Sequence, residues 1–261
     1  WTPCMPMADA PPLQGVTVLV TRPARQAAGL MGSITSAGGQ AVGFPLLHIE
    51  AEPPGSVGEL SNLDQINLLI FISANAVEHA LPLLPSPLPA KMEIAAIGQS
   101  TARLCRERGL QVEHVPAGAA SESLLTLPRF TDLHGQRILI VRGHGGREYL
   151  AEQLRQRGAQ VDYAEVSRRV PSDEPLGRQL MVDIIIVTSG EALQNLARLA
   201  QRDRQTWPFE TPLLVLHPRI AGLAGELGFK LEPVVARQAN DDGLMAALVE
   251  WAQSSREQTQ L

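Results

Sequence analysis

The feature that most constrains the fold is an internal repeat, because three pairs of segments recur in the same order in the two halves of the chain. The first pair is predicted as strand, turn, helix, glycine and strand, and the second as an apolar strand that ends in a serine before a helix. The third is predicted as strand, turn, helix, glycine, strand, loop and helix. The pairs lie at 16–45 and 136–165, at 68–81 and 184–196, and at 94–127 and 213–248. Solenoid repeats recur about every 20 to 50 residues. Offsets near 120 residues therefore indicate one βα-rich unit that is used twice.

The repeated strands are short and apolar throughout, as in LLIFISANAV at 68–77 and IIIVTSGEAL at 184–193. Apolar strands that alternate with helices are typical of parallel sheets covered on both faces. The helices are expected to end at Gly109, Gly158 and Gly228, because glycine adopts the left-handed conformation that closes a helix. We therefore predict an α/β protein with two similar lobes, each a parallel β-sheet flanked by helices.

Small and polar residues follow the predicted strands. Ligands of parallel sheets gather beyond the carboxyl ends of the strands, where helix N-termini present free backbone N–H groups. The turns concerned are 21–22, 73–75, 98–101, 142–147, 188–190 and 217–219. Ser, Thr and Asn in such turns also cap helices, whatever the protein binds. Capping does not explain why all six turns suit an anion in a chain of net charge −5.

Arginine dominates the basic residues: Lys91 and Lys230 are the only lysines among 22 Lys and Arg residues. The planar guanidinium pairs bidentately with carboxylates and phosphates, although GC-rich codon usage would produce the same bias. The acidic balance argues against nucleic acid as a partner, because such proteins usually carry a basic excess.

Cys4 and Cys105 have neither metal-ligand spacing nor a disulfide framework, which favours a reducing, cytoplasmic setting. No apolar run reaches the roughly 18 to 20 residues of a membrane helix. The first twelve residues are left out of the fold prediction and lack the pattern of a signal peptide. These observations predict a soluble protein that does not enter a membrane.

The glycine-rich turn RGHGGR at 142–147 resembles a phosphate-binding loop, but its spacing does not fit one. The dinucleotide pattern G-x-G-x-x-G begun at Gly143 meets Gly145 and then Glu148, and no Gly-Lys-Ser/Thr triplet occurs. The six histidines are scattered without metal-site spacing. No serine after a predicted strand is framed by glycines as a nucleophile elbow would require. What remains is a metal-free site of backbone N–H groups, hydroxyls and arginines that suits a polycarboxylate.

Eight motifs, taken together and in this order, resemble the uroporphyrinogen-III synthase family over about residues 16–250. They are VLVTRP with RQAAGL, FISANAV, IAAIGQSTARLCRERG, ASESLL, ILIVRGHGGREYLAEQLRQRGAQV, VTSGEAL and NDDGLMAAL. The resemblance implies two α/β lobes joined by a two-stranded connector. The first lobe would be discontinuous, the second would be inserted into it, and the substrate would lie in the cleft between them. The implied bounds are 13–47 with 171–261, 50–165, and connectors at 46–50 and 165–172.

The family cyclises the linear tetrapyrrole hydroxymethylbilane to uroporphyrinogen III, with inversion of ring D and without a cofactor or metal. The resemblance implies this reaction here, through an azafulvene and a spiro intermediate. Loss of the hydroxyl leaves the azafulvene, and conformational restraint directs attack to the substituted carbon. A non-catalytic tetrapyrrole-binding or sensor module on the same scaffold is the alternative.

The resemblance also places a set of residues at the substrate, mostly in the turns after strands. The substrate-binding candidates are Arg22, Ser73, Ala74, Asn75, Thr101, Arg142, Gly145, Gly146, Arg147, Thr188, Ser189 and Arg219. The instability of the substrate would favour transient contact with hydroxymethylbilane synthase, and the surface composition favours a monomer.

The catalytic residue is left unassigned. The family carries a tyrosine, proposed to help the hydroxyl leave, just before an arginine pair on the returning connector. This sequence reads YAEVSRRVP there, with Ser167 in that position. Tyr163 lies four residues earlier and, by the period of two, on the same strand face. Tyr163 and Ser167 are therefore the two candidates.

Overall fold

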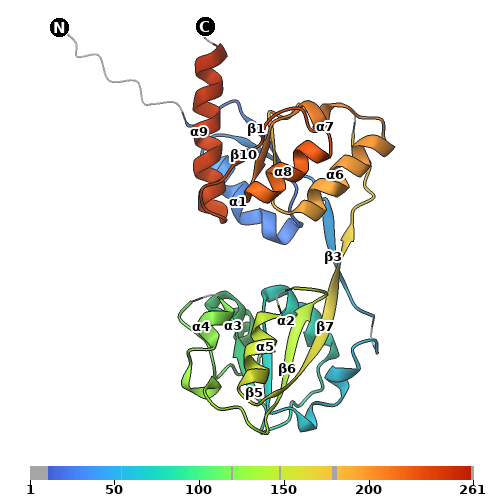
Figure 1. The fold of residues 1–261 in the computed structure, drawn as a ribbon, viewed down its shortest axis with the longest axis vertical. Helices are drawn as coiled ribbons and strands as arrows, with labels where there is room; N and C mark the ends of the chain where they lie inside the picture. The colour runs from blue at the N-terminus through green and yellow to red at the C-terminus, as the bar shows by residue number, and fades with distance from the viewer. Residues whose placement is uncertain (1–10, 54, 119, 147, 178–180, 260–261) are drawn as a thin grey trace, which may run out of the picture. The chain divides into compact units, whose positions relative to one another are not determined.

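The computed structural model describes residues 11–259 except 54, 119, 147 and 178–180. Contacts between residues divide the chain into two compact units, which Figure 1 draws as two bodies. The first unit runs up to His48 and resumes at Val170, whereas the second is continuous, Ile49–Arg169. The chain therefore passes between the units twice.

The first unit is built on a five-stranded parallel sheet in the order β10-β9-β8-β1-β2. Its centre pairs two strands from distant parts of the chain, with Val18 of β1 opposite Ile184 of β8. The side chains of these central strands are almost fully buried, which explains their continuous apolar sequences. The strands are β1 (Thr17–Val20), β2 (Gln40–Gly43), β8 (Ile184–Val187), β9 (Leu213–Val215) and β10 (Val234–Val235).

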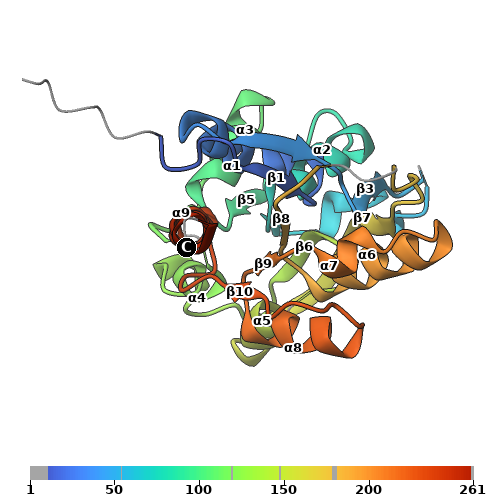
Figure 2. The same cartoon turned by 90° about the horizontal axis from the view of Figure 1, so that it is seen from above.

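Helices cover both faces of this sheet. Helices α1 and α9 share one apolar core with the sheet, and α6, α7 and α8 share the other. Figure 2 views α9 almost end-on and shows α6, α7 and α8 gathered away from it. The helices are α1 (Ala24–Ser36), α6 (Gly190–Arg202), α7 (Trp207–Glu210), α8 (Pro218–Glu226) and α9 (Asp241–Thr259). Among the helices of the described residues, none combines the length and hydropathy needed to span a membrane.

The second unit has its own five-stranded sheet, in the order β3-β7-β6-β4-β5. Strands β7, β6, β4 and β5 run parallel to one another. Helices α2 and α3 pack on one face, and α4 and α5 pack on the other. The elements are β3 (Leu47–Ala51), β4 (Leu68–Phe71), β5 (Glu93–Ala96), β6 (Arg137–Gly143), β7 (Gln160–Pro171), α2 (Ala74–Ala80), α3 (Gln99–Glu107), α4 (Ser121–Leu124) and α5 (Tyr149–Gln156). Short 3₁₀ helices lie at Gly58–Ser61, Leu63–Gln65, Leu81–Leu83 and Pro128–Phe130.

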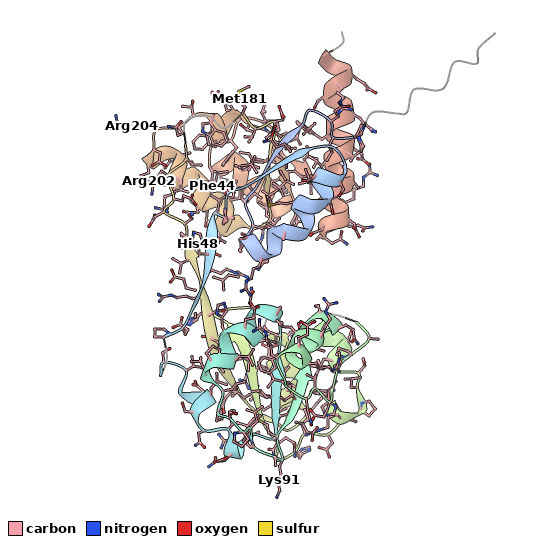
Figure 3. The ribbon with its side chains drawn as sticks, turned by 180° about the vertical axis from the view of Figure 1, so that it is seen from behind. Phe44, His48, Lys91, Met181, Arg202 and Arg204 are labelled. Carbon is pink, nitrogen blue, oxygen red and sulfur yellow. The ribbon has the colours of Figure 1, made fainter. Side chains whose placement is uncertain are left out.

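The two passages of the chain are neighbouring strands, β3 and β7. The backbone N–H of Glu52, just after β3, donates to the Val166 carbonyl of β7 at 2.9 Å. Figure 3 labels Phe44 and His48 near the start of β3. Phe44 is buried in the core of the first unit, whereas His48 is exposed. The side chains of this segment therefore cease to be fully buried where β3 passes from the first unit to the second.

Asn195 of α6 holds both chain segments at the point where they leave the first unit. It is buried, and its Nδ2 donates to the carbonyls of Leu46, at 2.6 Å, and Ser172, at 3.0 Å. The Ser172 N–H also donates to the Leu46 carbonyl at 2.9 Å. One amide side chain thus ties the outgoing and the returning segments together.

The predicted α/β class with two parallel sheets flanked by helices is confirmed. The predicted glycine closures are confirmed as well, since Gly109, Gly158 and Gly228 have φ values of 84°, 94° and 90°. The strand predicted after Gly109 is wrong, because only an isolated bridge between Ala95 and His114 forms there. The Glu113 carboxylate accepts the Ile94 N–H at 2.8 Å, and a side chain therefore occupies a donor that a longer strand would use.

Candidate functional site

At the carboxyl edge of the first sheet, the side chains of two polar residues accept hydrogen bonds from backbone N–H groups of the helices that follow. Ser189 begins α6, and its Oγ accepts the Ala192 N–H at 3.2 Å. His217 begins α8 in the same way, with Nδ1 accepting the Arg219 N–H at 3.1 Å. The Arg219 side chain is exposed. Helix capping therefore accounts for Ser189 and His217, and leaves the Arg219 guanidinium facing solvent.

Arg22 is bound within the first unit. Its Nη1 lies 2.5 Å from Asp241 Oδ1, and its Nε donates to Thr188 Oγ1 at 3.4 Å. The Arg22 side chain is only 13% exposed, whereas Asp241 is 45% exposed. Two predicted residues, Arg22 and Thr188, are thus brought together, and Asp241 at the start of α9 is a partner that the strand-end prediction did not include.

The second unit brings Ser73, Ala74, Asn75 and Thr101 to the ends of β4 and β5. Ser73 Oγ caps α2 by accepting the Ala76 N–H at 3.2 Å. Ala74 is exposed, Asn75 is half-buried and Thr101 is buried in α3. Capping therefore accounts for Ser73 as it does for Ser189.

Arg142, the last residue but one of β6, is the centre of a charged cluster in the second unit. The residue is only 7% exposed. Its Nη1 donates to Glu148 Oε1 at 2.9 Å, and its Nη2 lies 3.0 Å from Glu165 Oε1. Its guanidinium carbon lies 3.6 Å from the centroid of the Tyr163 ring, which is within the range of a cation–π contact. Two carboxylates and one aromatic face therefore hold this arginine.

Tyr163 belongs to the same cluster through its hydroxyl, which donates to Glu148 Oε2. Burial raises the pKa of Tyr163, and the hydrogen bond to the Glu148 carboxylate raises it further. The Tyr163 hydroxyl and then the Arg142 guanidinium lower the pKa of Glu148. Burial alone would lower the pKa of Arg142, but its hydrogen bonds to Glu148 and Glu165 raise it. These shifts favour a charged Arg142–Glu148 pair beside a neutral tyrosine.

The glycine-rich turn brings Glu148 back over Arg142. Gly145 and Gly146 are exposed and have φ values of 73° and 124°, a region that strongly favours glycine. Arg147 lies outside the described residues. Glu148 precedes the first residue of α5, and its side chain does not cap that helix. The turn therefore places the Glu148 carboxylate against Arg142, and this side chain does not cap α5.

Ser167 is buried opposite Gly143. Arg142 pairs with Glu165, but the next residue of β6, Gly143, pairs with Ser167 across a register shift. A Cβ atom at Gly143 would lie 3.1 Å from Ser167 Oγ, which explains why the smallest residue occupies this position. The expected period of two is therefore interrupted between Tyr163 and Ser167.

His144 joins the cluster to a third carboxylate, that of Glu52. Its Nε2 lies 3.2 Å from Glu52 Oε1, and its Nδ1 lies 3.4 Å from Glu165 Oε2. A cavity of about 440 Å³ opens here, lined by Glu52, Ser56, Val57, Glu59, Arg142, His144, Tyr163 and Glu165. Sequence reasoning missed Glu52 and Glu165, for which no motif gave a signal, and treated His144 as one of several scattered histidines.

Arg142 and Tyr163 also line a second cavity, of about 310 Å³. The lining of this cavity includes the apolar residues Ile72, Ile97 and Leu150 as well as Ser121 and Glu122. The two residues therefore belong to the lining of both cavities. Within the described ranges, no group of three or more His, Cys, Asp and Glu side chains is arranged to hold a metal ion.

A smaller charged cluster lies at the start of β5, away from these cavities. The Glu93 carboxylate accepts from Arg129 Nε at 2.8 Å and is hydrogen-bonded to His114 Nε2. Burial alone would raise the pKa of Glu93, but the hydrogen bonds from Arg129 and His114 bring it below its usual value. This cluster joins β5 to the segments that follow it and is not part of either cavity.

Fold and site together define an α/β protein of two similar units with charged and hydroxyl residues at the carboxyl ends of parallel strands. The sequence matches the family described as "Uroporphyrinogen-III synthase HemD" over residues 29–246. The chain belongs to the uroporphyrinogen-III synthase family.

Individual relatives agree with this membership. The chain is 35% identical to the uroporphyrinogen-III synthase of Salmonella typhimurium over 89% of its own length and 100% of that protein. It is 34% identical to the Escherichia coli protein of the same name, with the same coverage. The crystal structure of uroporphyrinogen-III synthetase from Helicobacter pylori aligns with a TM-score of 0.57 and 15% identity, covering 90% of this chain and 99% of that one. That last likeness concerns the fold.

Proposed function

We propose that this protein cyclises hydroxymethylbilane to uroporphyrinogen III, with inversion of ring D, in tetrapyrrole biosynthesis. One observation carries the proposal: the chain is 35% identical to a uroporphyrinogen-III synthase along the whole length of that relative. The polar carboxyl edges of the two parallel sheets support it, because they suit a substrate that carries many carboxylates.

The reaction depends on a fixed conformation of the substrate more than on a strong nucleophile in the protein. The pyrrole nitrogen expels the hydroxyl and leaves an electrophilic azafulvene, which the nearest unsubstituted ring carbon attacks when nothing restrains the chain. Inversion requires attack at the substituted carbon, a spiro intermediate, and reclosure. A protein achieves this by fixing the conformation of the tetrapyrrole and by excluding water from the cation.

We assign the carboxylate contacts to groups that remain available at the strand ends. The Arg219 guanidinium is exposed, and no ion pair to it is present within the described part of the chain. Gly145 and Gly146 are exposed and present backbone N–H groups in a turn. Arg22 and Arg142 already pair with protein carboxylates. Their first role in this proposal is therefore to position Asp241, Glu148 and Glu165, and a substrate carboxylate would have to displace those partners to bind them.

The test supplies freshly prepared hydroxymethylbilane and separates the uroporphyrin isomers after oxidation. We expect the type III isomer, formed faster than the spontaneous reaction. Type I alone, at the rate seen without protein, would refute the enzyme. If only type I formed and the protein still bound the tetrapyrrole, the protein would be a non-catalytic binding module.

We further propose a monomer that works in the cytoplasm. Among the described residues, the exposed large hydrophobic side chains are Tyr149, Met181 and Leu231, and they come from separate segments of the chain. Met181 is labelled in Figure 3 and is 85% exposed. Light scattering across a concentration series tests the monomer. A transient contact with hydroxymethylbilane synthase would protect the unstable substrate, and cross-linking during turnover tests it.

A further inference from the structure

His144 lines the charged cavity and carries the imidazole group found there. Its two ring nitrogens face two different carboxylates, Glu52 at 3.2 Å and Glu165 at 3.4 Å. A neutral imidazole carries one N–H and one lone pair, so one carboxylate would face a lone pair. Both contacts are within ion-pair distance, so an imidazolium at this position would lie between two carboxylates.

Glu52 strengthens this conclusion. Its Oε1 atom is buried and makes no hydrogen bond within the described residues. Burying a carboxylate is costly unless a positive charge offsets the lost hydration. Within the described part of the chain, the contact with His144 brings a positive charge to this oxygen when the ring is protonated. The backbone holds the histidine in place, since the His144 N–H donates to the Ser167 carbonyl at 2.7 Å.

The proposed reaction needs a proton, because hydroxide is a poor leaving group and water is a good one. The Tyr163 hydroxyl already donates to Glu148, and its pKa is raised by burial and by that carboxylate. Ser167 is buried opposite Gly143. Histidine is the side chain that readily gives up a proton near neutral pH. Of the side chains that line the cavity, His144 is the one suited to this task.

This inference rests on the function proposed above. We propose that the His144 imidazolium protonates the departing hydroxyl of the linear tetrapyrrole in the cavity of about 440 Å³. The C–O bond breaks as the pyrrole nitrogen lone pair is drawn towards the carbon, and the hydroxyl leaves as water with the proton of His144. The proton that the substrate releases when its last ring regains aromaticity returns His144 to the imidazolium.

The charges of the cavity suit this transfer. Before the step the positive charge is on His144, and afterwards it is on the azafulvene. Glu52 and Glu165 face the imidazolium, and Glu59 lines the same cavity together with Arg142 and Tyr163. The carboxylates that stabilise the imidazolium are thus also placed to stabilise the cation that replaces it.

His144→Gln tests the inference, with His134→Gln as its matched control. His134 also pairs with a carboxylate, Asp132 at 2.7 Å, but its side chain is 84% exposed and lies outside both cavities. We expect His144→Gln to lower kcat/KM by about 100-fold, the usual effect of losing a general acid. The fall in rate at alkaline pH, which comes from loss of the imidazolium proton, should disappear. His134→Gln should keep the wild-type rate and pH profile.

Glu52→Gln is the second variant and keeps the inference testable if His144→Gln does not fold. It removes the carboxylate charge beside His144 Nε2 while preserving the shape of the side chain. We expect a loss of kcat/KM, because the imidazole loses one of the two carboxylates that hold it in the cavity. An unchanged kcat/KM for Glu52→Gln, or a His144→Gln rate within about twofold of wild type, would overturn the role of His144. Formation of type III uroporphyrinogen by the wild type separates that failure from failure of the proposed function.

Discussion

Arg142→Met is expected to destabilise the second unit without affecting the first. The guanidinium is packed between the Tyr163 ring and the carboxylates of Glu148 and Glu165 at the end of β6. Methionine preserves much of the apolar stem that β6 buries, and it removes the charge and the planar donor group. The substitution therefore isolates the electrostatic part of the cluster.

The magnitude follows from the exposure of the partners. A largely buried cation–π contact at 3.6 Å contributes about 1 kcal/mol or somewhat more. The pair with Glu165, whose side chain is 32% exposed, adds up to about 0.5 kcal/mol, because water screens part of it. The contact with the more exposed Glu148 adds little for the same reason. A loss of about 1 to 2 kcal/mol lowers the urea midpoint by about 1 M at the usual slope for a small domain.

The distribution of aromatic residues allows the two units to be followed separately. Tyr149 and Tyr163 both lie in the second unit, and the described tryptophans, Trp207 and Trp251, both lie in the first. Urea unfolding is followed by tyrosine emission and by tryptophan emission on the same samples. The midpoint of the tyrosine transition should fall in Arg142→Met, whereas the tryptophan midpoint should stay at its wild-type value.

Arg103→Met is the matched control. Arg103 pairs with Glu107 at 3.8 Å in the same unit, but the two side chains are 76% and 60% exposed. Its loss should change the tyrosine midpoint by less than about 0.3 M. An Arg142→Met midpoint no lower than that of the control would refute the cluster as a source of stability. A parallel fall of the tryptophan midpoint would refute independent unfolding of the two units.

Three further outcomes are expected. Asn195→Ala should lower the tryptophan midpoint, with a loss of about 1 to 3 kcal/mol, because it removes two buried hydrogen bonds; an unaffected midpoint would contradict this. Burial raises the pKa of Cys105 to about 11, so in a Cys4→Ser background a thiol reagent at pH 8 should label the native protein at least about 100-fold more slowly than the unfolded protein. Because the pKa of Glu93 is lowered by its partners, its contribution to stability is present above the ordinary carboxyl range and is lost as the pH falls through it. Between about pH 5 and pH 3 the tyrosine midpoint should therefore fall less in Glu93→Gln than in wild type, and equal slopes would count against it.

Much of the fold could be predicted from local patterns. The apolar strands at 68–71 and 184–187 are continuous because both faces of each sheet are covered, and burial of both faces is visible in any short window of sequence. The helix ends at Gly109 and Gly158 can be predicted equally well from the sequence, because the left-handed conformation depends on the residue itself. The short pairing after Gly109 was not predictable, since it depends on where the Glu113 side chain finds a donor.

The charged cavity could be predicted only in part. Arg142 and the glycine-rich turn stood out because they follow an apolar strand. Glu52 and Glu165 lie 113 residues apart in sequence, and they meet at His144 because β3 is a neighbour of β7 in the sheet and β7 is a neighbour of β6. Such meetings depend on tertiary pairing, and a period of two along β7 fails at the register shift beside Gly143. No single segment carries that information.

The pairing of β1 with β8 sets an order on synthesis. The second unit is continuous, and its sheet can be completed once the ribosome has made β7. Strand β1 must wait for β8, since Val18 has Ile184 as its partner. During that interval the apolar strand β1 has no β8 to pair with, and α1 has no complete sheet to pack on. The second unit, which follows them in sequence, is already folded. The emerging chain therefore passes through a stage in which the second unit is finished and the first is exposed to misassembly, and a pause in translation between β7 and β8 would lengthen it.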